Sequence, residues 1–209
     1  MNKLSFFASY IHYLVHPFRS HELLLSEDSQ GLRHLNVSES IGMSWIFVVL
    51  NGFFRILLIN LVLFLFLDIQ ADADYIFSLF DNEDKYIGFY FLILSTILDV
   101  IFYPLFMLFF IQFWEFILKI FGSLLGVEDI SSKTQDIMSV AMSSQILVMI
   151  PVFGGIAQKM ASMILMFAGV KKQLNVSTAM AVCIMSAPLV LVLGFFSLIV
   201  FSYILGLTT

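Results

Sequence analysis

Three stretches of this chain are long and almost free of charged side chains, and they limit its fold more than any other feature. They cover residues 44–67, 86–125 and 177–205. About 20 consecutive apolar residues are enough for a helix to cross the hydrocarbon core of a bilayer. Lipid supplies no hydrogen bonds to the backbone, so uninterrupted apolar stretches of this length favour helices. The sequence therefore predicts an all-α, polytopic transmembrane bundle.

The composition supports a membrane location. Of the 209 residues, 60% are apolar and only 12% are charged, whereas a soluble domain carries about 25% charged residues. No cluster of Lys and Arg indicates nucleic acid as a partner. The single cysteine, Cys183, excludes an internal disulfide. The first expected partner is the lipid bilayer itself.

Two shorter segments complete the predicted bundle. Residues 136–150 and 156–170 flank a turn that contains Pro151, Gly154 and Gly155. They look like a helical hairpin, and counting them gives about five crossings. The segment 86–125 is too long for one ordinary span. We interpret it as a single helix kinked near Pro104, with a re-entrant break at the same proline as the alternative.

The first residues form a separate unit in this interpretation. Residues 1–42 are expected to be a cytoplasmic N-terminal segment, and residues 43–209 the transmembrane domain. Within the first unit, residues 4–15 have apolar side chains at helical spacing, and Pro17 should end that helix. It is too short to cross a bilayer, so an amphipathic helix at the membrane interface is predicted.

The basic residues give an orientation. Lys and Arg concentrate on the cytoplasmic side of membrane proteins. With five crossings, the basic residues before the first crossing, around residues 119–133 and at Lys171 and Lys172 all fall on one side. The acidic segment 68–84 and the Gly-Gly turn fall on the other. The N-terminus is therefore predicted to be cytoplasmic.

Arg55 and Asp99 are the most unusual charges. Each lies about midway along a predicted crossing, and because consecutive crossings run in opposite directions, both should lie at a similar depth. An unpaired charge at the centre of a bilayer costs about 2.5–3.5 kcal/mol. We therefore expect the two to pair inside the bundle, either as a structural tie or as part of a transport path.

Other polar residues also mark the predicted helices. Glu115 and Lys119 are four residues apart, the spacing of an ion pair on one helix face. Gln145, Gln158 and Lys159 lie in the two short segments, where broken helices can mark a substrate site. Close helix packing through small residues is the other interpretation of these segments. No catalytic motif is present, so no enzyme activity, cofactor or metal site is predicted.

One pattern in the second half of the chain resembles a known family. A helix rich in small and polar residues is followed by Pro151, Gly154 and Gly155, and then by a short helix with Gly169 before Lys171 and Lys172. Ser177 then precedes a helix that contains Pro188. This arrangement resembles the Yip family, membrane proteins named for their interaction with Ypt/Rab GTPases.

The resemblance implies five transmembrane helices, a cytoplasmic N-terminus and a role in membrane organisation or traffic. Eukaryotic members bind Rab GTPases and carry an Asp-Leu-Tyr-Gly-Pro motif in a long cytosolic region. This chain lacks that motif, so it is more similar to prokaryotic members, and a Rab-type partner is not expected.

Two functions follow as hypotheses. The first is a non-enzymatic protein of a bacterial inner membrane that binds another membrane protein or itself, with a Golgi or endoplasmic-reticulum membrane as the alternative location. The second is a small-solute transporter or channel that uses Arg55 and Asp99.

Overall fold

The computed structural model describes residues 3–25, 35–68, 82–151 and 153–208, and these residues are helical apart from short connections. The elements are α1 (Lys3–Val15), α2 (Pro17–Leu25), α3 (Val37–Asp68), α5 (Asn82–Leu124), α6 (Ile130–Ala141), the 3-10 helix η1 (Met142–Met149), α7 (Gly154–Gln173) and α8 (Thr178–Thr208). The predicted all-α class is confirmed for the described residues.

Three of these helices are long and apolar enough to cross a membrane. The qualifying segments are Val37–Leu58 in α3, Ile93–Leu124 in α5 and Thr178–Tyr203 in α8. Within the described part of the chain, α6 and α7 do not meet the same standard, because α6 is short and α7 contains several lysines. A multi-pass membrane protein with three candidate spans is therefore supported.

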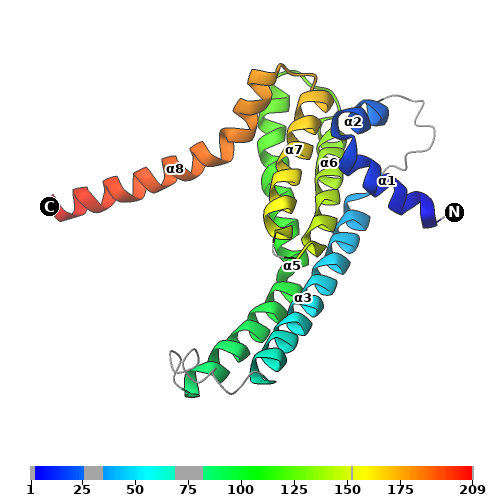
Figure 1. The fold of residues 1–209 in the computed structure, drawn as a ribbon. Coiled ribbons are helices and arrows are strands. Elements are labelled where there is room, and N and C mark those ends of the chain that lie inside the picture. Colours follow the sequence, from blue (N-terminus) through cyan, green and yellow to red (C-terminus); the bar gives the residue numbers. More distant parts are fainter. Residues whose placement is uncertain (1–2, 26–34, 69–81, 152, 209) are drawn as a thin grey trace.

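Residues 82–124 form one helix. Pro104 lies inside α5 without ending it, and Figure 1 shows that the ribbon bends between its two halves. A proline removes one backbone hydrogen bond and crowds the preceding turn, which is the common cause of such a bend. The structure thus has the single helix that the sequence favoured, and it does not have the break that was the alternative.

The N-terminal segment contains a second helix that the sequence did not predict. α1 ends at Val15, as expected from Pro17, but α2 begins at that proline. The first position of a helix tolerates proline because its N–H would have no helical partner. α2 has only nine residues, which is too short a stretch for helical periodicity to be recognised in the sequence.

The buried core lies where the short helices meet α3 and α5. It includes Tyr10 and Tyr13 of α1, Trp114 of α5 and Met138 of α6, and it continues through η1 and α7 to Ile184 of α8. α6 runs beside the upper half of α5, and α7 packs against α6. Figure 1 also shows that the lower halves of α3 and α5 form a separate pair and that the end of α8 projects away from the rest.

Candidate functional site

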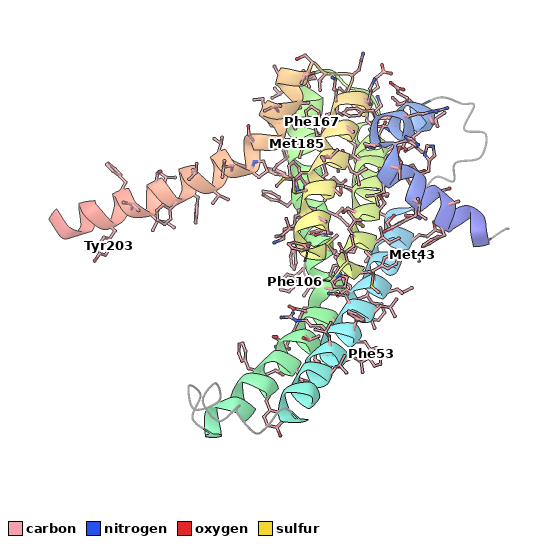
Figure 2. The ribbon with its side chains drawn as sticks, viewed as in Figure 1. Met43, Phe53, Phe106, Phe167, Met185 and Tyr203 are labelled. Carbon is pink, nitrogen blue, oxygen red and sulfur yellow. The ribbon has the colours of Figure 1, made fainter. Side chains whose placement is uncertain are left out.

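A groove with an apolar wall lies between α5, η1, α7 and the first half of α8, and the end of α6 also contributes to its lining. Its volume is about 760 Å³, within the range of small-molecule binding sites. Six of the eleven methionines line it, together with Phe110, Trp114 and Phe167. Figure 2 shows Phe167 of α7 and Met185 of α8 close together at the base of the projecting part of α8, and both line the groove.

Gln145, Gln158 and Lys159 lie together in this groove. Gln145 of η1 is 7% exposed, Gln158 of α7 is half-buried, and Lys159 is exposed. Among the described residues, none of the three side chains has a hydrogen-bond or ion-pair partner. The structure therefore brings these sequence-predicted residues to one place, and leaves their polar groups able to contact a ligand.

The close fit between η1 and α7 positions these side chains. A Cβ atom at Gly154 would lie 2.6 Å from the carbonyl oxygen of Leu147 and 2.7 Å from that of Val148. Only glycine permits the start of α7 to approach the end of η1 so closely. This approach brings Gln158 and Lys159, in the first turns of α7, beside Gln145.

The apolar wall of the groove was not predicted from the sequence. Trp114 and the methionines lie in separate helices, and no motif in the sequence links them. Methionine is flexible and polarizable, so it suits surfaces that adapt to apolar ligands. The concentration of methionine in residues 138–185 is the signal that was available, but these residues meet only because α6 and α8 pack against both α5 and α7.

Arg55 and Asp99 do not form the expected pair. They lie on α3 and α5, which pack against each other, but both side chains are exposed. In the described part of the chain, no ion pair joins them. The contact between the two helices runs instead through Gly52, where a Cβ atom would lie 3.1 Å from Thr96 and 3.3 Å from Val100.

Glu115 and Lys119 do form the expected ion pair. The Nζ atom of Lys119 lies 2.7 Å from Oε1 of Glu115. Ser131 at the start of α6 donates a 3.4 Å hydrogen bond to the same carboxylate oxygen. Both charged side chains remain partly exposed, so the pair contributes less than about 1 kcal/mol to stability. Its geometry suits a connection between α5 and α6.

Some residues of the family-like pattern have structural positions that explain their types, and Gly155 does not. Gly169 touches His21 and Ile137, since a Cβ atom there would lie 2.9 and 3.0 Å from those side chains. Ser177 accepts a 3.3 Å hydrogen bond from the N–H of Met180 and so caps α8. Pro188 lies inside α8 and lines the groove. Pro151 belongs to the hairpin turn, and Gly155 meets no atom within 4 Å of its ideal Cβ position.

The N-terminal helices are packed onto this assembly. The hydroxyl of Tyr10 donates a 2.8 Å hydrogen bond to the carbonyl of Met142, where α6 becomes η1. Ser44 of α3 donates to the same carbonyl at 3.4 Å. Lys172 near the end of α7 forms an ion pair with Glu22 of α2. α1 is therefore attached to the middle of the first arm of the hairpin, and α2 to the end of the second.

The class that the fold supports is a helical protein with three candidate membrane spans and a groove beside the last of them. Comparison of the chain with protein-family models, with curated proteins and with solved structures gives no match.

Proposed function

We propose that this chain is a non-enzymatic, multi-pass membrane protein of the Yip type that binds another membrane protein, or a second copy of itself, through its N-terminal helices. Its role would be membrane organisation. The observation that supports this proposal is the packing of α1. Its inner face is fixed against the bundle, and its outer face exposes large apolar side chains.

The two faces of α1 differ sharply. Tyr10 and Tyr13 have no exposed surface, whereas Phe7, Ile11 and Val15 are 44%, 40% and 60% exposed. An amphipathic helix of this kind lies at the level of the lipid headgroups. Because α1 is held by a buried hydrogen bond, its apolar face has a fixed direction, which favours recognition of a particular surface.

Five crossings and a cytoplasmic N-terminus are part of the proposal. The α6–η1 segment and α7 would supply the third and fourth crossings, and their lengths support this, since each covers 20 residues. A bacterial inner membrane is the proposed location. The twin lysines at the end of α7 would then lie on the cytoplasmic side with α1 and α2.

Photocrosslinking from single sites tests the partner-binding role. Deletion of residues 1–20 is a poor test, because it removes the buried Tyr10 and Tyr13. We instead suggest a photoreactive amino acid at Ile11 in cells, with Val190, which is 64% exposed on α8, as the matched lipid-facing control.

The proposal expects one protein adduct of defined mass from Ile11 and lipid adducts alone from Val190. Changing Phe7 and Val15 to Ser should abolish the protein adduct while the purified protein keeps its helical content. Lipid adducts alone from both sites would contradict partner binding through α1.

A further inference from the structure

We propose that the groove between α5, η1, α7 and α8 binds one amphipathic lipid with an anionic headgroup, with the headgroup at Lys159, Gln145 and Gln158 and an acyl chain along the methionine-rich wall. This inference concerns a different surface from α1, and it does not depend on partner binding there.

The charges of the groove point to an anion. Lys159 is the only charged residue among those that line it, and neither Asp nor Glu is present in the lining. In the part of the chain that the structure describes, Lys159 also has no counter-ion. A cation beside lipid that lacks an internal partner is stabilised by an anionic group from outside.

The two amides complete a headgroup site. Gln145 and Gln158 lie on either side of the hairpin and both line the groove with Lys159. A carboxamide donates two hydrogen bonds, and phosphate oxygens are strong acceptors for amide and ammonium donors. Since Gln145 is only 7% exposed, a ligand that bonds to it must enter the groove rather than lie on its rim.

The remaining wall suits an acyl chain. Trp114, Met138 and Met166 are buried at its floor, whereas Met163 and Val192 form exposed edges. One side of the groove is α8, which is a candidate membrane span. A lipid could therefore enter laterally from the bilayer, with no passage of its chain through water. A free anion such as inorganic phosphate would leave this apolar wall unfilled.

Quenching of tryptophan fluorescence by brominated lipid measures occupancy directly. The chain has two tryptophans, and Trp114 lines the groove while Trp45 does not. The difference in quenching between the wild type and Trp114→Phe therefore reports on the groove. The protein is reconstituted in phosphatidylcholine, and a minor fraction of the lipid is replaced by brominated phosphatidylglycerol or by brominated phosphatidylcholine.

The expected result is stronger quenching of Trp114 by the anionic lipid. In Lys159→Gln the preference for the anionic lipid should fall by about fivefold, the contribution of one lysine near an anionic surface. Lys171→Gln removes the same charge elsewhere on α7 and should keep the preference. Val192→Phe narrows the groove and should reduce quenching by either lipid, whereas Leu191→Phe, on the same helix but outside the lining, should not.

Three results would overturn the proposal. The first is equal quenching by the two lipids in the wild type, and the second is an anionic preference that survives in Lys159→Gln. The third is loss of the preference when inorganic phosphate is added to the protein in mixed detergent–lipid micelles, because the site would then take a free anion. Helical content and a single elution peak confirm that each variant is folded.

Discussion

The indole N–H of Trp45 donates a 2.8 Å hydrogen bond to the carbonyl oxygen of Val100. This carbonyl belongs to the residue four positions before Pro104, so in a regular helix its partner would be the N–H of residue 104. Proline has no such N–H. Trp45 on α3 thus supplies the hydrogen bond that Pro104 removes from α5, and it joins the two helices at that point.

The first prediction concerns this replacement bond. Trp45→Phe should lower the stability of the protein by about 1–2 kcal/mol, because a carbonyl within a candidate membrane span has no water to replace the lost donor. Pro104→Ala restores the helical N–H at position 104. In that background, Trp45→Phe should lower the stability of the protein much less. Thermal unfolding of the four variants in one detergent gives the double-mutant cycle. An equal effect in both backgrounds would show that the indole acts through packing alone.

The second prediction concerns the contact between α7 and α2. Gly169→Ala should destabilise the protein by about 1–3 kcal/mol, because the added methyl group would lie 2.9 Å from the ring of His21 and 3.0 Å from Ile137. Gly155→Ala is the matched control on the same helix, since nothing lies within 4 Å of that Cβ position. It should be neutral or slightly stabilising. Similar thermal midpoints for both variants would disprove the close contact.

The third prediction concerns acid sensitivity. Burial lowers the pKa of His21 to about 4, and a weaker interaction with the backbone of Leu165 opposes this shift. The pKa of an unfolded histidine is about 6.5. Protonation therefore favours states in which α2 has left α7. The contribution of neutral His21 to stability should be complete above about pH 6.5 and should decline as the pH falls from there to about 4.

Thermal midpoints across this pH range measure the effect. His21→Leu places an apolar side chain at the buried position. This variant should not show the decline in stability between about pH 6.5 and pH 4 that comes from protonation of His21. His16→Leu removes an exposed histidine nearby and should keep it. If His21→Leu and the wild type lose stability in parallel as the pH falls, the effect belongs to other groups.

The sequence predicted the elements that depend on local patterns. The apolar stretches became α3, α5 and α8, and the turn at Pro151, Gly154 and Gly155 separates η1 from α7. The spacing of Glu115 and Lys119 is a property of one helix, so their ion pair was also predictable. These features need only hydrophobicity, turn residues and helical periodicity.

Features that depend on packing between helices were not accessible in the same way. α2 has only nine residues, and it is recognised by its contacts with α7 and α1. The groove requires side chains from α5, η1, α7 and α8 to meet. The sequence did identify the three polar residues of the groove, because amides and a lysine are unusual in apolar segments. The many methionines of residues 138–185 did not by themselves show that they share one wall.

The positions of Arg55 and Asp99 also depend on how two helices pack, which the sequence does not determine. They lead to the fourth prediction. Equal depth in two adjacent helices does not fix their rotation, and here the positions that face each other are Gly52 with Thr96 and Val100. Arg55 and Asp99 are both exposed and are not joined by an ion pair in the described structure. The effects of Arg55→Gln and Asp99→Asn on stability should therefore be additive, with an interaction energy below about 0.5 kcal/mol.

A double-mutant cycle of thermal unfolding in lipid nanodiscs provides the measurement, and the cycle for Glu115→Gln and Lys119→Gln shows what a surface ion pair contributes under the same conditions. An interaction energy of about 1 kcal/mol or more between Arg55 and Asp99 would mean that the two charges meet in the membrane, and would restore them as a candidate transport site.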